Sequence, residues 1–419
     1  MLLTPEAFKQ DFEALVDLGQ GGDGKVSLFA HRRIEGRFVA VKFPLDSSRR
    51  RSFKNEIENL RRIGAHDNII ELLGWDKYGI PYGPQLYLDY CDIGDLLDYR
   101  DKLISAYGYV PEDTVWKLFA DMSKALDHMH HTLKVPMIHG DIKADNILVK
   151  TPSGFSGQTI PVVPVFKLAD FSRSSLYSPG DKNVPDSRWF GSLQYQPPLE
   201  EHEKQTPAVD IWGVGATIQG FVLSIFPLQS SEEFLEQHAR RNPSVFREGQ
   251  NRPERQDSCW WRYRPVLHRP LNSHRQPDIP PEPYSEPLEQ WYALCLQPDA
   301  RKRITASALV ENVVPLAQRQ MNIIQAQRVL KKHQEKLEQR KKERQLRKDT
   351  KAPTNEDAGT RPRHASPSSP RLSIHLDLDT ISGLQKASSA DSNELKNLKQ
   401  YEAAYLDGTR GQENKGCIS

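Results

Sequence analysis

The sequence of 419 residues predicts an α+β fold of two unequal lobes, followed by a C-terminal tail that is first helical and basic and then disordered. Residues 12–92 contain strand-like runs around one amphipathic helical segment, which predicts a small β-rich lobe. Residues 93–315 return apolar side chains every three or four positions, which predicts a larger and mainly helical lobe. Residues 316–350 are dense in charge, and residues 351–419 are poor in large apolar side chains.

Composition narrows the class of protein without naming a partner. With 37% hydrophobic residues the chain can fill a sizeable core, and its formal net charge of +2 gives no overall attraction to nucleic acid or membranes. The four cysteines lie far apart without a CxxC pair, which argues against a zinc site and a disulfide framework. We therefore expect a reducing compartment, the cytoplasm, with the nucleus as the alternative.

One apolar run could be taken for a membrane span. Residues 211–228 are mostly apolar, but they include Gln219 and three glycines and end near Pro227. This composition predicts a buried core helix. The N-terminus has no basic start followed by an apolar run, so we expect no export signal.

The small lobe contains a glycine-rich turn and a strand that ends in a cation. Residues 19–26 read GxGxxGxV, where glycines let backbone amides approach phosphate oxygens, although a plain hairpin turn would explain this piece equally well. The apolar run 38–41 then ends at Lys42. An amphipathic segment at 53–63 predicts a helix, and 86–88 predicts a further strand.

The most specific signal lies in the large lobe. Residues 139–146 read His-Gly-Asp-Ile-Lys-Ala-Asp-Asn and are followed by an apolar run at 147–149. A second apolar run leads into Asp170-Phe171. An Asp-Phe pair means little by itself, but its place after Asn146 and after an apolar strand gives it weight.

In their order over about residues 15–310, these segments resemble the protein kinase family, and the lysine two positions after Asp141 resembles its serine/threonine branch. The resemblance implies a bilobal protein kinase fold with an N-lobe at 12–92 and a C-lobe at 93–315. It implies Asp141 as the catalytic base, Lys143 as the cation on the γ-phosphate, and Asn146 and Asp170 as ligands of Mg²⁺. By the same resemblance Lys42 binds the ATP phosphates and pairs with Glu56, with Glu58 as the alternative.

The resemblance also implies how ATP is held. Leu88 would be the gatekeeper, backbone groups of Asp89 and Cys91 would bond the adenine edge, and Asp95 could reach the ribose, although a helix cap explains Asp95 nearly as well. The remaining residues implied to bind the nucleotide are Gly19, Gln20, Gly21, Gly22, Asp23, Gly24, Val26, Ala40 and Leu148.

The sequence departs from the family pattern in several places. Gly140 stands where many kinases have an arginine that receives a phosphorylated loop residue, so control by such a phosphate is in doubt. Ser172 replaces a glycine after Asp170-Phe171, and the long interval before Asp170 predicts an enlarged hairpin turn at 151–157. The glutamate that closes the activation segment is displaced, and we expect Glu200 to pair with Arg303.

The predicted function is transfer of the γ-phosphoryl group of Mg-ATP to serine and threonine hydroxyls of protein substrates. A pseudokinase or scaffold that uses the fold for binding is the alternative, and an adaptor that acts through its tail is a third class. The basic residues within 316–350 favour a solvated charged helix over a surface for nucleic acid or acidic lipid, so we do not expect a nucleic-acid partner, while another partner for this segment stays open. His128, His130 and His131 favour packing and helix-surface roles over a metal site.

Overall fold

The computed structural model describes residues 2–22, 24–80, 82–157, 159–229, 268–273 and 282–349. Met1–Met321 form one compact unit, and the chain from Asn322 onward belongs to a second unit. The predictions for Asp23, for the tail at 351–419 and for most of 228–287 lie outside the described residues.

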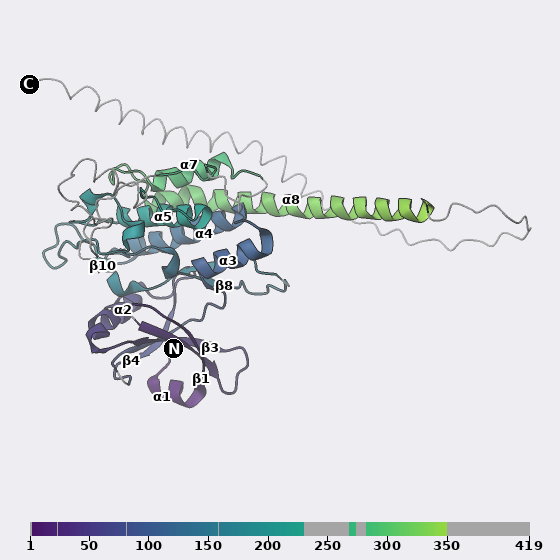
Figure 1. The fold of residues 1–419 in the computed structure, drawn as a ribbon. Helices are drawn as coiled ribbons and strands as arrows, with labels where there is room; N and C mark the ends of the chain where they lie inside the picture. The colour runs from purple at the N-terminus through teal and green to yellow at the C-terminus, as the bar shows by residue number, and fades with distance from the viewer. Residues whose placement is uncertain are drawn as a thin grey trace, which may run out of the picture. The chain divides into compact units, whose positions relative to one another are not determined.

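The small lobe is built on a five-stranded antiparallel sheet (Figure 1). Its strands are β1 (Phe12–Gln20), β2 (Gly24–His31), β3 (Phe38–Pro44), β4 (Leu72–Asp76) and β5 (Gln85–Leu88). Their order in the sheet is β1-β2-β3-β5-β4, so β3 lies in the middle. This central position holds Lys42 on a strand with hydrogen-bonded neighbours on both sides, Val26 in β2 and Leu86 in β5.

A helix that the sequence reasoning missed covers one face of this sheet. Helix α1 (Pro5–Asp11) begins after Thr4, whose hydroxyl accepts a hydrogen bond from the N–H of Ala7, and it has Pro5 in its first turn. Phe8 packs with Phe12, Val39, Val41 and Tyr87 in one buried cluster. Since side chains alternate along a strand, Lys42 projects from the opposite face of β3.

Helix α2 (Arg50–Ile63) contains the segment predicted at 53–63, and it follows a short 3₁₀ turn, η1 (Ser47–Arg49). Its buried residues Phe53, Glu56, Ile57, Leu60 and Ile63 recur every three or four positions, as an amphipathic helix requires. Glu56 is therefore carried on the buried face of α2.

The large lobe is mainly helical, as predicted. Its main helices are α3 (Leu96–Tyr107), α4 (Glu112–Asp127), α5 (Ala208–Leu223), α7 (Glu286–Cys295) and α8 (Ala306–Asp349), and α4 runs into a π-helical turn, η2 (His128–Thr132). Helix α5 contains most of the apolar run at 211–228, and nearly all of its residues are buried. The prediction of a core helix is confirmed. Among the helices that the structure describes, none has the length and apolar content that crossing a bilayer requires.

Short strands and 3₁₀ turns connect these helices. Strands β6 (Gly94–Asp95), β8 (Ile147–Lys150) and β9 (Val165–Leu168) form one small sheet, and β7 (Met137–Ile138) pairs with β10 (Ser175–Leu176). The 3₁₀ turns are η3 (Ala144–Asn146), η4 (Phe171–Arg173), η5 (Leu193–Tyr195) and η6 (Leu199–Glu201). Strands β8 and β9 are antiparallel neighbours, so residues 151–164 form the enlarged hairpin connection that the sequence predicts.

Helix α8 begins before residue 316, where the sequence places the start of a basic helix, and it includes Pro315. Within the first unit it buries Ala306, Leu309, Val313, Leu316 and Met321, spaced as one helix face. In the second unit Val329, Leu330, Leu337 and Leu346 are exposed, while Ile323 and Ile324 are half-buried. The early part of α8 is therefore core structure of the large lobe.

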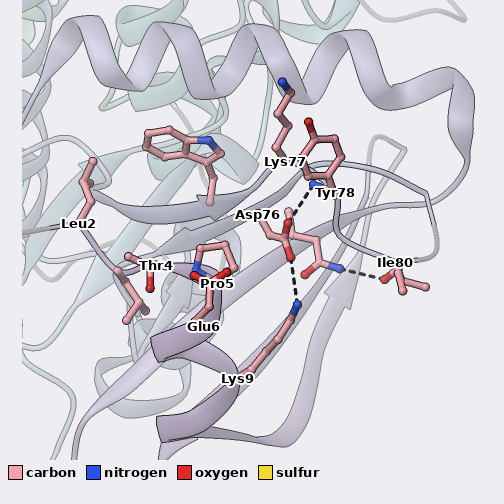
Figure 2. Close-up of a pocket in the computed structure, with 12 residues that line it drawn as sticks. Leu2, Thr4, Pro5, Glu6, Lys9, Asp76, Lys77, Tyr78 and Ile80 are labelled. Atoms are coloured by element: carbon pink, nitrogen blue, oxygen red, sulfur yellow. Dashed lines mark hydrogen bonds and ion pairs between the residues drawn. The ribbon is translucent and has the colours of Figure 1, made fainter.

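A groove of about 690 Å³ opens on the small lobe between the residues around α1 and the turn from β4 to β5 (Figure 2). Trp75 lines it, the ammonium of Lys9 lies 3.6 Å from a carboxylate oxygen of Asp76, and Tyr78 and Ile80 are strongly exposed beside it. None of its lining residues belongs to the predicted nucleotide site.

Candidate active site

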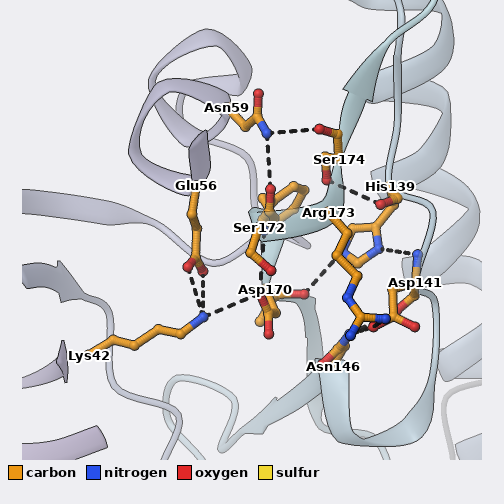
Figure 3. A network of polar contacts seen from close by, with 12 residues as sticks. Lys42, Glu56, Asn59, His139, Asp141, Asn146, Asp170, Ser172, Arg173 and Ser174 are labelled. Atoms are coloured by element: carbon orange, nitrogen blue, oxygen red, sulfur yellow. Dashed lines mark hydrogen bonds and ion pairs between the residues drawn. The ribbon is translucent and has the colours of Figure 1, made fainter. Parts of the chain in front are cut away.

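Lys42 forms ion pairs with two carboxylates that come from different parts of the chain (Figure 3). Its ammonium lies 2.8 Å from Oε2 of Glu56 on α2 and 3.2 Å from Oδ1 of Asp170, which follows β9. Lys42 also lies over the ring of Phe53, 5.5 Å from its centroid. Lys42 contacts Glu56, the partner that the sequence predicts, so α2 is docked toward the sheet.

Burial and neighbouring charges shift the pKa values of Lys42 and Asp170 in opposite directions. Burial by itself would lower the pKa of Lys42, but the carboxylates of Glu56 and Asp170 outweigh it and raise that pKa. Burial would raise the pKa of Asp170, yet the neighbouring ammonium lowers it to about 2. The site therefore holds a charged lysine and an ionised aspartate side by side at neutral pH.

The predicted catalytic loop is fixed from below by Asp210 at the start of α5. Its two carboxylate oxygens accept hydrogen bonds of 2.8 Å from the backbone N–H groups of His139 and Gly140, and a ring nitrogen of His130 lies 2.9 Å from one of them. Gly140 has φ +78°, a left-handed conformation that costs a residue with a side chain roughly 1–2 kcal/mol. Glycine removes that cost at this position.

His139 joins the loop to the segment around Asp170. Its ring nitrogen lies 3.0 Å from the carbonyl oxygen of Ala169, and its ring packs edge-on against Phe171 at 4.9 Å. Asn59 on α2 donates from its side chain to the carbonyl oxygens of Phe171 and Ser174. These contacts connect α2, which contains Glu56, to the catalytic loop, which contains Asp141, and to the segment that contains Asp170.

Asp141, the predicted base, has polar neighbours around its carboxylate. Oδ1 accepts a 2.7 Å hydrogen bond from the backbone N–H of Ser192, and Oδ2 lies 3.6 Å from the guanidinium of Arg173. The side-chain amide of Asn146 donates to the Asp141 carbonyl oxygen at 2.8 Å. The sequence reasoning missed Arg173 and Ser192, because neither lies at a fixed spacing from Asp141 that a local pattern could reveal.

Asn146 and Asp170 fit the binding of a divalent cation. The amide nitrogen of Asn146 is held by the Asp141 carbonyl, which leaves its amide oxygen as a ligand, and Asp170 is ionised. Two protein oxygen ligands suit Mg²⁺, which also takes water and phosphate oxygens. Within the described ranges there is no cluster of three or more histidine, cysteine or acidic side chains that could hold a metal, so the three histidines form none.

The predicted adenine edge presents two backbone groups with open hydrogen-bonding capacity. Within the described part of the chain, neither the carbonyl of Asp89 nor the N–H of Cys91 makes a backbone hydrogen bond. Buried backbone groups are normally paired, so this edge fits a planar ligand with a donor and an acceptor. Leu88 and Ala40 are buried neighbours across β5 and β3, while Leu148 faces Asp95 across β8 and β6.

Asp95 caps α3, as one of the two sequence interpretations expects. Its Oδ1 accepts hydrogen bonds from the N–H groups of Leu97 and Asp98, and burial raises its pKa. The other carboxylate oxygen is not used by the cap. Lys143 is half-buried beside η3.

The glycine-rich turn connects β1 and β2. The N–H of Gly21 donates to the carbonyl of Gly24 at 2.9 Å, which closes the turn. A Cβ at Gly24 would meet Phe43 and Phe53 at 2.5–2.8 Å, whereas a Cβ at Gly19, Gly21 or Gly22 would meet nothing within 4 Å. Only Gly24 is therefore demanded by packing, and the other three leave open space that phosphate oxygens can use. Gln20 and Val26 flank the turn on β1 and β2.

The pairing predicted between Glu200 and Arg303 is wrong. Arg303 forms a two-point ion pair with Glu201, with nitrogen–oxygen distances of 2.7 and 2.9 Å, and also lies over the Trp212 ring. Glu201 is buried and Glu200 is exposed. The turn η6 points only the second of the two adjacent glutamates inward.

The arrangement of a lysine–glutamate pair, an Asp-Lys-Asn loop and an aspartate that contacts the same lysine agrees with the comparison to known families. The protein kinase domain model matches residues 12–314. The chain belongs to the protein kinase family. Its bilobal fold and its family membership are thus as the sequence predicts, and the family generally uses ATP and a divalent metal ion.

Relatives of this kinase chain cover it to different extents. A probable protein kinase of Dictyostelium discoideum is 26% identical over 312 residues, which is 72% of this chain and 71% of that protein. The serine/threonine-protein kinase SIK1 of Rattus norvegicus is 29% identical over 220 residues, 50% of this chain and 25% of that protein. The membrane-associated tyrosine- and threonine-specific cdc2-inhibitory kinase wee-1.3 of Caenorhabditis elegans is 29% identical over 216 residues, 50% of this chain and 28% of its own length. The chain spans only about a quarter of the last two.

Proposed function

We propose that this chain is an active protein kinase that transfers the γ-phosphoryl group of Mg-ATP to serine and threonine hydroxyls of protein substrates. The observation that carries the proposal is the simultaneous contact of Lys42 with Glu56 and Asp170. In protein kinases this ion pair and the metal-ligating aspartate must both be in place for phosphoryl transfer.

Each residue of the site has a task in that reaction. Lys42, whose positive charge is stabilised by two carboxylates, binds and orients the α- and β-phosphates of ATP. Asn146 and Asp170 hold the Mg²⁺, which neutralises charge on the β- and γ-phosphates when bound. Asp141 orients the substrate hydroxyl and accepts its proton, and Lys143 stabilises negative charge on the transferred phosphoryl group.

Preference for serine and threonine rests on narrower support. Lys143, two positions after the base, resembles the serine/threonine branch, and two of the relatives above bear names that include threonine or serine/threonine specificity. The wee-1.3 kinase is described as tyrosine- and threonine-specific, so the acceptor residue has to be measured directly. Identifying the phosphorylated amino acids in a general protein substrate decides this point.

The test of activity is a phosphoryl-transfer assay on the full chain with Mg-ATP. We expect Asp141→Asn to lower kcat by about 10²-fold or more, because it removes the proton acceptor. Asp170→Ala should lower the rate and raise the Mg²⁺ concentration that gives half of the maximal rate, because it removes a metal ligand. No transfer by the wild-type chain to itself or to general substrates, together with equal nucleotide binding by Asp141→Asn, would exclude an active kinase.

A scaffold is the alternative, and one observation favours it. Ser172 occupies the position of a glycine beside the metal ligand, and its N–H donates back to Asp170 at 3.3 Å. If the chain acts as a scaffold, the Lys42→Met variant should keep the cellular role of the protein. If the chain acts as a kinase, the same variant should lose that role.

A further inference from the structure

Three polar side chains join separate parts of the segment between Asp170 and Glu201, which we call the activation segment. The side-chain amide nitrogen of Gln205 donates to the hydroxyl of Ser175 at 3.0 Å and to the hydroxyl of Ser187 at 2.9 Å. The two hydroxyls also lie 2.9 Å from each other. Ser175 lies in β10 near the start of the segment, Ser187 lies near its middle, and Gln205 follows the segment, so three separate parts of the chain meet in a closed cluster of three side chains.

The backbone holds this cluster in place on both sides. Ser175 pairs with Ile138 of β7, the strand that leads into the catalytic loop. On the other side, the N–H of Gln205 donates to the carbonyl of Ser187 at 2.9 Å, and the N–H of Trp189 donates to the carbonyl of His202 at 2.9 Å. Trp189 is buried against Ile138. The start and the middle of the activation segment thus both contact Ile138 of β7, the strand that leads into the catalytic loop.

The fastened segment reaches the predicted base directly. Beyond Trp189, the carbonyl of Phe190 accepts a 2.6 Å hydrogen bond from the Arg173 guanidinium, which also lies 3.6 Å from Asp141. Two residues later the N–H of Ser192 donates to Asp141 at 2.7 Å. Release of Ser187 would therefore loosen the stretch that positions the Asp141 carboxylate.

Because Gly140 has no side chain, the side chain of Gln205 can lie close to the backbone of the catalytic loop. Gln205 is only 4% exposed, and a Cβ at Gly140 would lie 3.2 Å from its amide oxygen, with φ +78° already unfavourable for a side chain. Both residues border a cavity of about 300 Å³ that Arg173, Arg188 and Phe190 complete. The buried glutamine amide thus stands beside the position where many kinases carry the arginine that receives a phosphate.

We propose that Gln205 is a positioning residue that, through Ser175 and Ser187, holds the activation segment against the catalytic loop without a phosphate group. The proposal rests on the proposed kinase function, because it concerns the regulation of the same site. Neutral hydrogen bonds among three side chains take the place of a charged phosphate contact. The unphosphorylated chain is then already in its catalytic arrangement.

The test uses the full chain before and after treatment with a general phosphatase that is removed before the assay. We expect the wild-type chain to keep its kcat, and its KM for the general protein substrate of the activity assay, after treatment with the phosphatase. Gln205→Leu keeps the size of the side chain but removes its amide, and we expect kcat/KM for the same substrate to fall about tenfold while nucleotide affinity and Tm stay close to wild type. Gln10→Leu, at an exposed glutamine of α1, is the matched control.

A double variant separates a cluster from independent effects. If Gln205 acts through Ser187, Gln205→Leu combined with Ser187→Ala should be no slower than Gln205→Leu alone. Hydrogen exchange at the amides of Trp189 and Ser192 should be faster in Gln205→Leu than in the wild type, and unchanged in β8 and β9. That measurement does not depend on catalysis.

The outcomes distinguish this proposal from the proposed function. A wild-type chain that transfers phosphoryl groups but loses that activity with phosphatase overturns the phosphate-free arrangement alone. An active chain in which Gln205→Leu changes neither kinetics nor exchange overturns the role of Gln205. A wild-type chain without activity under any phosphorylation state overturns the proposed function itself.

Discussion

The ammonium of Lys42 lies 2.8 Å from the carboxylate of Glu56, and this contact joins the central strand of the small lobe to its one long helix. Glu56 is 1% exposed, so its charge depends on the protein around it for stabilisation. The same ammonium contacts Asp170, which places the lysine that we expect to bind the nucleotide and the predicted metal ligand in one electrostatic unit.

Lys42→Met tests that unit as a source of stability as well as activity. We expect the free energy of unfolding to fall by about 3 kcal/mol, because the variant leaves Glu56 buried without its lysine. Urea denaturation of wild type and variant measures the change. Lys42→Met combined with Glu56→Gln is the control, and it should recover much of the loss, since Glu56 then carries no charge and only the more exposed carboxylate of Asp170 lacks its cation. A double variant less stable than Lys42→Met would contradict this explanation.

Glu200 and Glu201 are adjacent acidic residues, and we expect their replacement by alanine to have different effects on the free energy of unfolding. Glu201→Ala should lower the free energy of unfolding by about 3 kcal/mol, because it leaves the buried guanidinium of Arg303 without its two-point partner. Glu200→Ala, at an exposed position, should change it by less than about 0.5 kcal/mol. Thermal or urea unfolding of both variants checks this, and equal effects would contradict the pairing of Glu201 with Arg303 as a source of stability.

Local spacing made the central site residues predictable from the sequence. The glycines of 19–24, Lys42, the loop at 139–146 and Asp170 each stand in short patterns whose chemistry can be read without the fold. The amphipathic period at 53–63 predicted the helix that carries Glu56, and the resemblance to protein kinases implied its pairing with Lys42. Family membership and the two-lobed fold followed from the order of these pieces.

What the sequence could not reveal depends on tertiary contacts or on one-residue choices. Arg173 and Ser192 reach Asp141 only because the activation segment folds back, and no periodic pattern encodes that path. Glu200 and Glu201 differ only in the direction that η6 gives them. The start of α8 was placed too late because the change in composition near 316 marks a change of surroundings, not of secondary structure, and α8 continues through Pro315.

His66 gives a pH dependence whose sign follows from its surroundings. Burial, and next the ring of His128 stacked at 4.8 Å, lower the pKa of His66 from 6.5. In the unfolded chain this histidine binds a proton near pH 6.5, so below that pH the unfolded state takes up more protons than the folded state. We expect stability to fall as pH decreases from about 6.5, and to level off only below the lowered pKa.

The measurement is urea unfolding across that pH range for the wild type and for His66→Gln. The variant removes the titrating ring, so its stability should depend less steeply on pH between about 6.5 and 5. His131→Gln, at an exposed position on the π-helical turn, is the control and should leave the slope close to wild type. A steeper slope in His66→Gln would contradict the assignment.

Truncation within α8 separates the kinase unit from the basic segment. Ala317 and Met321 are buried, so a chain that ends at residue 316 lacks core side chains of the large lobe, whereas one that ends at 325 keeps them. Losing the buried Met321 side chain should by itself cost about 1.5–3 kcal/mol. We expect the 1–325 chain to unfold at the same urea concentration as the full chain and to phosphorylate general substrates at the wild-type rate. We expect the 1–316 chain to unfold at a lower urea concentration.

If the 1–325 chain folds like the wild type but loses phosphoryl transfer, residues after 325 contribute to catalysis. If it keeps catalysis but loses its cellular role, those residues bind a partner, and Lys42→Met in the full chain shows whether that role also needs the kinase reaction.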